Sequence, residues 1–280
     1  MSAKKKGSEI RVAASYAVLV LFSVIALFPV WQIVSISLRP ADRLLATTLE
    51  LVPANASFRN YEALFTDRPF ILWMFNSTFV AAAVTLSGVV LASTCGYAFS
   101  RFQFIGKKAG LLSLLVTQMF PATMLLLPMY IMLVNLGLIN SYLGIVIMYS
   151  ATALPFCIWQ MKGYYDTIPT SLEEAGRIDG CNQFQTFYRI ILPLAAPALV
   201  ITALFSFMAA WTEYLVAAQI LQDTELWTLP LGLKSFESNM GSEWGLYGAA
   251  SVIVTIPVVI LFLSLSRWLV SGLTLGSVKG

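Results

Sequence analysis

The sequence predicts an all-α membrane protein with six transmembrane helices. Hydrophobic residues make up 58% of its 280 residues and charged residues only 11%, whereas soluble domains average about 25% charged residues. Lysine and arginine are absent from 12–38, 69–100, 109–161 and 244–266. Because a transmembrane helix needs about 20 mostly apolar residues, each of these intervals can hold at least one helix.

The helices follow from these intervals and from one further apolar segment, APALVITALFSFMAAWTEYLVAAQIL. The interval 109–161 holds two of them, since its segment NLGLINSY has the asparagine, glycine and serine typical of a turn. The first apolar segment is too long for a cleaved signal peptide, so we keep it as a span. We expect the six helices at 13–37, 70–99, 109–134, 142–161, 196–221 and 246–270. Together they form one transmembrane domain, 13–270.

Lysine and arginine orient these helices, because the cytoplasmic loops of membrane proteins are enriched in both. If the N-terminus is cytoplasmic, twelve of the seventeen positive residues lie on the cytoplasmic side, with net charges of +7 inside and −3 outside. The N-terminus 1–12, the segment 162–195 and the tail 271–280 are then cytoplasmic. The segments 38–69 and 222–245 are then external. The net positive charge reflects this orientation and does not indicate nucleic-acid binding.

The sequence argues against catalysis by this chain. It contains no histidine, which excludes histidine metal sites, proton relays through histidine and Ser-His catalysis. It also lacks the G-x-x-x-x-G-K loop that binds the phosphates of ATP. The three cysteines, Cys95, Cys157 and Cys181, lie in or beside predicted spans or in the cytoplasmic segment, so none suggests a disulfide.

The longest run of closely spaced polar residues, SLEEAGRIDGCNQF at 171–184, lies in the cytoplasmic segment. Ser171 and Glu174 have the spacing of a capping box, in which the two side chains bond backbone N–H groups at the helix start. Gly180 is a natural stop for this helix. The sequence therefore predicts one short helix that ends at the glycine.

A second helix is expected to begin at Asn182, whose side chain is a good cap, with Gln185 three residues later. It should run to Pro193 and form a bent pair with the first helix. The apolar faces of the pair are expected to comprise Ala175 and Ile178 on the first helix, and Phe184, Phe187, Ile190 and Ile191 on the second.

Two residues of the first helix are unfavourable for the helix itself. Asp179 lies in the last turn, where a negative charge opposes the helix dipole by about 0.3 to 1 kcal/mol. It should have a partner, either a backbone N–H at the start of the next helix or a cationic residue of another protein. Gly176 costs about 1 kcal/mol relative to alanine, and its small size permits close approach by another surface. A docked cytoplasmic partner and a solvated loop both remain open.

The segment EEAGRIDGCNQFQTFYRIILPLAAPAL resembles the EAA loop of ABC-importer permeases, which has the pattern E-A-A-x-x-D-G-A, then an aromatic-rich helix and I-x-L-P. The matching residues are Glu174, Ala175, Asp179, Gly180, Ile190, Leu192, Pro193 and Pro197. Gly176 and Cys181 depart from the pattern, which has alanine at both positions. Both are small residues, so the departures affect only local helix stability.

The resemblance extends over essentially the whole chain and is closest to the MalG-type permease family of maltose and maltodextrin importers. Its other matching segments are FRNYEALF, MFNS, YAFSRFQFIGK, QMFPA, AAWTEYLVA and RWLVSGLTLGSVKG. It implies the type I ABC importer permease fold in a bacterial or archaeal cell membrane. It also implies the function of a permease subunit in an ATP-driven sugar importer, with malto-oligosaccharide as the expected substrate.

The same resemblance implies the partners of this chain. A second, homologous permease (MalF-like) would complete the translocation path in the lipid bilayer. Two ATPase subunits (MalK-like) would hold ATP and Mg, and an extracytoplasmic sugar-binding protein would deliver the substrate. This chain would bind no cofactor or metal and would not be an enzyme.

Three groups of contact residues are implied in the same way. Those coupling to the ATPase subunits are Glu174, Ala175, Gly176, Asp179, Gly180, Phe184, Phe187, Leu192 and Pro193. Those in the tail, which would insert between the ATPase subunits, are Gly272, Leu273, Thr274, Lys279 and Gly280. Those of the external loop, which would reach into the binding protein, are Ser235, Asn239, Gly241 and Trp244. A surface loop that covers the pore mouth is the alternative for this last group.

Glu213 is the only acidic residue inside a predicted span, and ionisable groups at such positions are functional candidates. It could line the translocation path and bind sugar hydroxyls, or it could snorkel to the interface or stabilise helix packing through a hydrogen bond. The stripe Gly88, Ala92 and Gly96 has small-xxx-small spacing, which indicates close helix packing. The prolines Pro121, Pro128, Pro155 and Pro257 lie in predicted spans and are expected to kink them.

A self-sufficient secondary carrier or channel is the alternative class of function. A proton-coupled carrier would need several intramembrane acids, bases or histidines, and this chain offers only Glu213. A membrane enzyme is less compatible still, because no paired catalytic groups are present. The sequence therefore favours the ATP-driven import permease.

Overall fold

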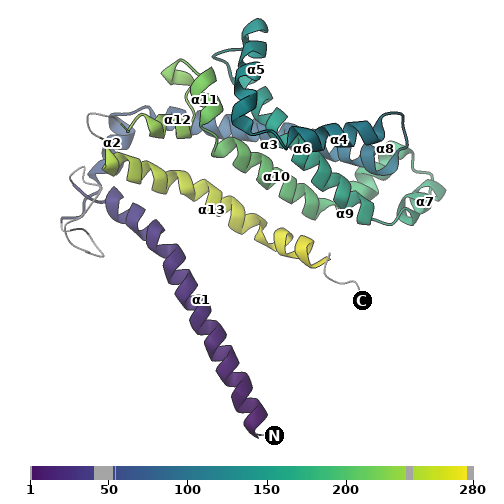
Figure 1. Cartoon of the computed structure of the whole chain (residues 1–280), viewed down its shortest axis with the longest axis horizontal. Coiled ribbons are helices and arrows are strands. Elements are labelled where there is room, and N and C mark those ends of the chain that lie inside the picture. The colour runs from purple at the N-terminus through teal and green to yellow at the C-terminus, as the bar shows by residue number, and fades with distance from the viewer. Residues whose placement is uncertain (1, 41–52, 54, 238–241, 276–280) are drawn as a thin grey trace. The chain divides into compact units, whose positions relative to one another are not determined.

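The computed structural model describes residues 2–40, 53, 55–237 and 242–275. The described residues are helical and contain no strand (Figure 1). In chain order the helices are α1 (Ser2–Ser37), α2 (Arg59–Thr66), α3 (Phe70–Arg101), α4 (Lys107–Thr117), α5 (Ala122–Asn135), α6 (Tyr142–Thr167), α7 (Ser171–Ile178), α8 (Gln183–Thr186), the π-helix η1 (Phe187–Ile191), α9 (Leu192–Leu194), α10 (Ala196–Trp211), α11 (Leu215–Ile220), the 3₁₀-helix η2 (Thr224–Leu226), α12 (Leu229–Lys234) and α13 (Trp244–Leu275).

The chain divides into two compact units. The first comprises Met1–Pro69 and Ser235–Thr255, and the second comprises Phe70–Lys234 and Ile256–Gly280. The boundary in the C-terminal part falls within α13. Each unit is described below by itself.

The first unit joins the end of α1 to the short helix α2. Asn60 Nδ2 donates hydrogen bonds of 2.9 Å to the carbonyl oxygens of Ser37 and Arg39, and the Tyr61 hydroxyl lies 2.8 Å from Ser37 Oγ. Arg68 pairs with both carboxylate oxygens of Glu243 at 2.7 Å. These bonds hold the two chain segments of the unit together. Most side chains of α1 from 12 to 30 are exposed and apolar, which suits a helix that faces lipid or another subunit.

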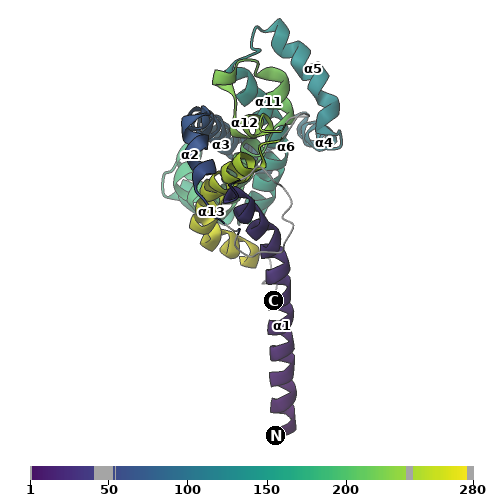
Figure 2. The same ribbon diagram turned by 90° about the vertical axis from the view of Figure 1, so that its left-hand side faces the viewer.

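The second unit is built on α3, α6 and α10, which lie side by side (Figure 1; Figure 2). The predicted small-residue stripe of α3 lies at this packing. A Cβ on Gly88 would be 2.4 Å from Ser206 Oγ of α10, and a Cβ on Gly96 would be 2.8 Å from Met161 Cβ of α6. Ala92 between them is fully buried. The packing role predicted for this stripe is therefore confirmed.

Four helices of the described residues are long and apolar enough to cross a membrane, at Val12–Ser37, Phe70–Arg101, Tyr142–Thr167 and Trp244–Trp268. They lie at the first, second, fourth and sixth predicted spans. The count of six spans stays a prediction, because the other two predicted spans are interrupted.

The third predicted span is divided between α4 and α5 by residues 118–121. Pro121 takes the N-cap position of α5, so it starts a new helix and does not kink a continuous one. Its missing N–H and fixed φ suit a helix start better than a helix interior. In both views α5 projects away from the helices α3, α6 and α10 (Figure 1; Figure 2).

The fifth predicted span is divided by residues 212–214 into α10 and α11. Glu213 lies at this division. Its carboxylate accepts hydrogen bonds from the backbone N–H groups of Val216 (3.0 Å) and Ala217 (3.3 Å). These are first-turn donors of α11 that have no partner in their own helix. Glu213 therefore stabilises the start of α11, and its place in the translocation path stays a prediction.

The first half of the predicted external loop is folded onto α3. The side chain of Trp73 donates to the carbonyl of Thr224 (3.1 Å), and Asn76 donates to the carbonyls of Glu225 and Trp227 (2.8 and 2.9 Å). Residues 222–234 contain η2 and α12 and are not an open loop.

Candidate functional site

The cytoplasmic segment predicted at 162–195 contains the end of α6, the short helices α7 and α8, and the helical turns η1 and α9. The predicted capping box at Ser171 is wrong. Ser171 is the first residue of α7, and Thr170 takes the cap position without a side-chain hydrogen bond. The reason is that the Thr170 backbone is already helical (φ −65°, ψ −24°), whereas a capping side chain requires an extended residue.

The end of α7 follows the prediction. Gly180 has φ +86°, a left-handed conformation that glycine adopts without strain. Its N–H bonds the carbonyl of Arg177 (3.1 Å), and the N–H of Cys181 bonds the carbonyl of Gly176 (2.9 Å). These two bonds make a Schellman motif, which satisfies carbonyls at the helix end.

The second capping box is confirmed. Asn182 Oδ1 accepts from the backbone N–H of Gln185, and Gln185 Oε1 accepts from the backbone N–H of Asn182, both at 2.9 Å. Reciprocal bonds of this kind satisfy two of the free donors at a helix start. The two short helices predicted for this segment are therefore present.

The chain then bends sharply into the membrane helix α10. The helical stretch Gln183–Leu194 and α10 meet at 78°. Within the stretch, Leu192 N bonds Phe187 O in the wider π-helical pattern. Pro193 and Pro197 have no N–H to continue the regular ladder, so the bend coincides with the prolines of the I-x-L-P pattern.

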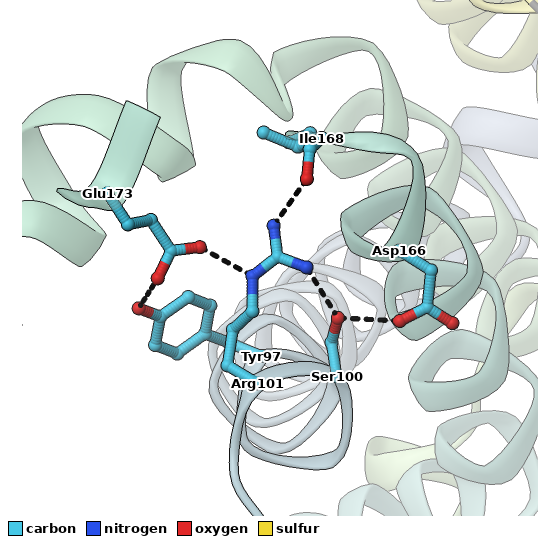
Figure 3. Close-up of polar contacts among 6 residues, drawn as sticks. All are labelled: Tyr97, Ser100, Arg101, Asp166, Ile168 and Glu173. Atoms are coloured by element: carbon cyan, nitrogen blue, oxygen red, sulfur yellow. Dashed lines mark hydrogen bonds and ion pairs between the residues drawn. The ribbon is translucent and has the colours of Figure 1, made fainter. Parts of the chain in front are cut away.

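Glu173 anchors α7 to the C-terminal end of α3. One carboxylate oxygen lies 2.5 Å from Arg101 Nε, and the other accepts a hydrogen bond from the Tyr97 hydroxyl at 3.0 Å (Figure 3). The side chains of Arg101 and Glu173 are only 10% and 6% exposed. A second guanidinium nitrogen donates to the carbonyl of Ile168 at 2.8 Å. Both charges are thus paired and hydrogen-bonded, as buried charges need to be.

The same arginine connects α3 to the end of α6. It donates to Ser100 Oγ (3.2 Å), which donates to Asp166 (2.6 Å) (Figure 3). The other Asp166 oxygen pairs with Lys162 at 2.5 Å. We call the set Tyr97, Ser100, Arg101, Lys162, Asp166 and Glu173 the charge clamp. It joins α3, α6 and α7 into one hydrogen-bonded junction.

Aromatic side chains pack against one side of the charge clamp. The Tyr97 ring lies 4.7 Å from the ring of Phe187 and 5.8 Å from that of Tyr165, measured between centroids. Phe187 is half-buried here and Tyr165 is fully buried. Phe187, predicted as a coupling residue, thus packs inside the chain and supports the junction.

The other face of α7 is exposed. Glu174, Ala175 and Asp179 are exposed, and Ile178 is 87% exposed. Phe184 on α8 is 72% exposed. Ala175 and Ile178 therefore share one face of α7, as predicted, and this face is the exposed one. Helical residues three apart share a face, and the buried pair is Glu173 and Gly176, which leaves Ile178 on the outside.

Gly176 has an internal reason to be small. A Cβ at this position would lie 2.4 Å from Ile190 Cδ1 of η1. The close approach that we expected from another protein is made by this chain itself. Leu192 is half-buried and Pro193 is exposed beyond this contact.

Asp179 is exposed, and its carboxylate has no hydrogen bond or ion pair with any described residue. The backbone N–H of Asn182, which could have been its partner at the start of the next helix, is taken by Gln185. Of the two partners predicted for Asp179, the internal one is therefore not found. Its charge remains available to another chain.

Sequence reasoning missed the charge clamp. It selected Glu174 because that residue begins the EAA pattern, and it did not select Glu173. One signal was available: Tyr97 and Arg101 are four residues apart at the end of a predicted span, so both lie on one helix face.

Some of the other predicted contact residues lie outside the described residues, namely Asn239, Gly241, Lys279 and Gly280. Ser235 follows α12 in a turn, Trp244 begins α13, and the backbone of Gly272, Leu273 and Thr274 is helical within α13. Within the described part of the chain, no cluster of three or more acidic or cysteine residues is arranged to hold a metal ion.

Comparison with known proteins gives consistent matches over nearly the whole chain. Residues 88–275 match the family described as binding-protein-dependent transport system inner membrane component. The maltose/maltodextrin transport system permease protein MalG of Yersinia pestis is 34% identical over 98% of this chain and 96% of the relative. The galactooligosaccharides transport system permease protein GanQ of Bacillus subtilis is 32% identical over 97% of this chain and 96% of the relative.

One solved structure shares the fold. It is a crystal structure of a bacterial ABC transporter involved in the import of the acidic polysaccharide alginate. The matching chain is 25% identical with a TM-score of 0.81, over 93% of this chain and 97% of that chain. The helical fold described above is therefore that of an ABC importer permease.

Proposed function

Because the chain belongs to the family of binding-protein-dependent transport system inner membrane components, we propose that it is a permease subunit of an ATP-driven sugar importer. The proposed cargo is maltose, maltodextrin or a related neutral oligosaccharide. The relatives that share about a third of its residues over nearly their whole length are permeases named for maltose, maltodextrin and galactooligosaccharides.

The proposed complex contains a second, homologous permease and two ATPase subunits that hold ATP and Mg. An extracytoplasmic binding protein delivers the sugar. In this arrangement both termini and the segment 162–195 face the ATPase subunits, in agreement with the distribution of positive residues. The tail residues Gly272–Gly280 contact the ATPase subunits, and the external segment around Ser235 and Trp244 contacts the binding protein.

The observation that carries this proposal is the two-sided character of α7. Its inner face is held by the ion pair between Glu173 and Arg101, while its outer face exposes Glu174, Ala175 and Ile178. A coupling element needs an exposed face, because it must contact a moving partner. It also needs a firmly held face, because it must pass the movement of the partner on to the membrane helices. The clamp transmits the displacement of α7 to α3 and α6.

The outer face has the chemistry of a docking site for an ATPase cleft. The side chains of Ile178 and Phe184 are apolar and largely exposed to the aqueous side. Isolated exposed apolar residues are common, but here they flank the acidic residues Glu174 and Asp179. An apolar socket with basic groups at its rim fits this surface, and such a charged rim sets the orientation of docking.

The test is sugar uptake and ATP hydrolysis by the full complex in proteoliposomes. Glu174→Lys should reduce maltose uptake to background, because it reverses the charge offered to the ATPase subunit, while the complex stays folded in the membrane. Asp67→Lys makes the same charge change at an exposed external residue and should retain uptake. Normal uptake and normal ATPase binding in Glu174→Lys would contradict the coupling role.

A further inference from the structure

A cluster of three residues holds the start of α13 to the turn between α2 and α3. Arg68 lies in this turn, at 67–69, and one of its guanidinium nitrogens is 2.7 Å from both carboxylate oxygens of Glu243. The guanidinium carbon lies 5.6 Å from the centre of the Phe236 ring, within the range of a cation–π contact. The backbone N–H of Glu243 donates to the carbonyl of Phe236 at 2.9 Å. We call Arg68, Phe236 and Glu243 the arginine lock.

The arginine lock lies beside two residues predicted to contact the binding protein. Phe236 directly follows Ser235, and Glu243 directly precedes Trp244. Phe236 is 1% exposed, whereas Ser235 is exposed and Trp244 is partly exposed. The buried ring and the paired carboxylate therefore fix the backbone next to each of the two contact residues. Both are connected to the same side chain, that of Arg68.

Close backbone packing gives the arginine lock a fixed base. A Cβ on Gly245 would lie 2.6 Å from Asn60 Nδ2 of α2, and this nitrogen bonds the carbonyls of Ser37 and Arg39. A Cβ on Gly248 would lie 3.0 Å from the backbone N of Ser37. The first turns of α13 are thus packed tightly against α2 and the end of α1. The arginine lock therefore joins the predicted contact residues to a closely packed part of the first unit.

The ion pair of the lock is suited to orientation more than to stability. The side chains of Arg68 and Glu243 are 37% and 36% exposed, and ion pairs this exposed contribute little to the free energy of unfolding. Hydrogen bonds between charged groups are nevertheless short and directional, so they fix where Glu243 lies. A surface that is ordered before its partner binds loses less side-chain and loop entropy on binding. The lock therefore affects binding more than folding.

We propose that Arg68 is a positioning residue for the surface that receives the sugar-binding protein. It holds the chain at Ser235 and Trp244 in the arrangement that this partner contacts, and it acts through Phe236 and Glu243 without touching the partner itself. The inference rests on the proposed function, since it presumes a binding protein that docks around these residues. It gives a function to an ion pair that stability does not explain.

The test measures ATP hydrolysis by the full complex in proteoliposomes as the concentration of its maltose-loaded binding protein is raised. Arg68→Gln should raise the concentration that gives half-maximal stimulation by about 2- to 12-fold, which corresponds to ordering roughly one more side chain at the interface. The maximal rate and the temperature of thermal unfolding should stay at wild-type values, because the ion pair adds little stability. Glu243→Gln should have the same effect as Arg68→Gln.

Steering by charge alone predicts a different pattern. Arg68→Gln removes a positive charge and Glu243→Gln a negative one, so charges that only steer the partner would shift its affinity in opposite directions in the two variants. The arginine lock predicts a loss in both. The double variant Arg68→Glu/Glu243→Arg restores the pair and should recover most of the affinity. Arg59→Gln is the matched control, since Arg59 is exposed on α2 and lies outside the arginine lock, and it should bind as the wild type does.

Three results would overturn the inference. Wild-type affinity in both single variants would show that the lock positions nothing, and opposite shifts would show that the charges only steer the partner. A loss of maximal rate together with an earlier unfolding transition would assign the pair a structural role. If ATP hydrolysis by the wild-type complex does not respond to any sugar-loaded binding protein, the proposed function itself fails and the inference fails with it.

Discussion

Adjacent acidic residues of α7 have opposite environments. Glu173 is 4% exposed and paired with Arg101, whereas Glu174 is exposed. The difference arises because successive residues of an α-helix point about 100° apart. The pattern match emphasised Glu174, the residue available to a partner. The residue that holds α7 to α3 is Glu173. The sequence pattern did not distinguish its environment from that of Glu174.

Breaking the ion pair should destabilise the junction between α7 and α3. Arg101→Glu or Glu173→Arg leaves a like-charge pair in a site where both side chains are nearly buried, and breaking a buried pair costs about 3–5 kcal/mol. Thermal unfolding of the purified complex should therefore begin at a lower temperature in either single variant, and maltose uptake should fall.

The double variant Arg101→Glu/Glu173→Arg is the matched control. It restores opposite charges across the same junction, so it should recover part of both the stability and the uptake. If the double variant is no better than the single variants, the ion pair does not act as a unit. If the single variants are as stable as the wild type, the clamp does not hold α7.

At the scale of the element, apolar length predicted helices well but not their interruptions. The helices α3 and α6 lie where uncharged intervals placed spans, since each is a continuous apolar stretch. The interruptions at 118–121 and 212–214 fall inside the two apolar stretches from which continuous spans were predicted. Their causes are specific: a proline starts α5, and a carboxylate caps α11. The average hydropathy of a segment does not reveal a proline at a helix start or a carboxylate that caps a helix.

The glycine contact between α3 and α6 gives a prediction at this scale. Gly96→Leu should destabilise the protein by roughly 1–3 kcal/mol or more, the usual range for overpacking, because the new Cβ would meet the Lys162 backbone N at 3.0 Å as well as Met161. Helix separation would be needed to make room. Urea or thermal unfolding of the purified complex measures the loss.

Gly163→Leu is the matched control on α6. A Cβ at Gly163 meets no atom within 4 Å, so the substitution should leave stability unchanged or raise it through better helix propensity. Equal stability of the two variants would show that α3 and α6 do not pack as closely as described.

At the scale of the whole molecule, family membership gives the membrane class and the positive-inside pattern predicts the orientation. A chain from the inner membrane component family with several apolar helices is a multi-pass membrane protein. The distribution of lysine and arginine predicts that the charge clamp lies on the cytoplasmic side and that α2 lies on the outer side.

This orientation can be tested by labelling single cysteines in intact cells with a membrane-impermeant thiol reagent, after replacement of the native cysteines. A cysteine at Thr66, which is exposed at the end of α2, should react in intact cells. A cysteine at Gln183, exposed at the start of α8, should react only after the cells are permeabilised. The reverse pattern would invert the topology and separate α7 from the ATPase side.

The sequence by itself determined the membrane class, the short helix pair and the family. These properties depend on composition, on local spacing and on side chains close in the chain, such as Asn182 with Gln185 and Gly180 in its left-handed turn. Only the tertiary structure decided which face of α7 is held and which is free. Arg101 and Glu173 are 72 residues apart in the chain, so their pairing depends on the packing of α3 against α6, and no local pattern encodes it.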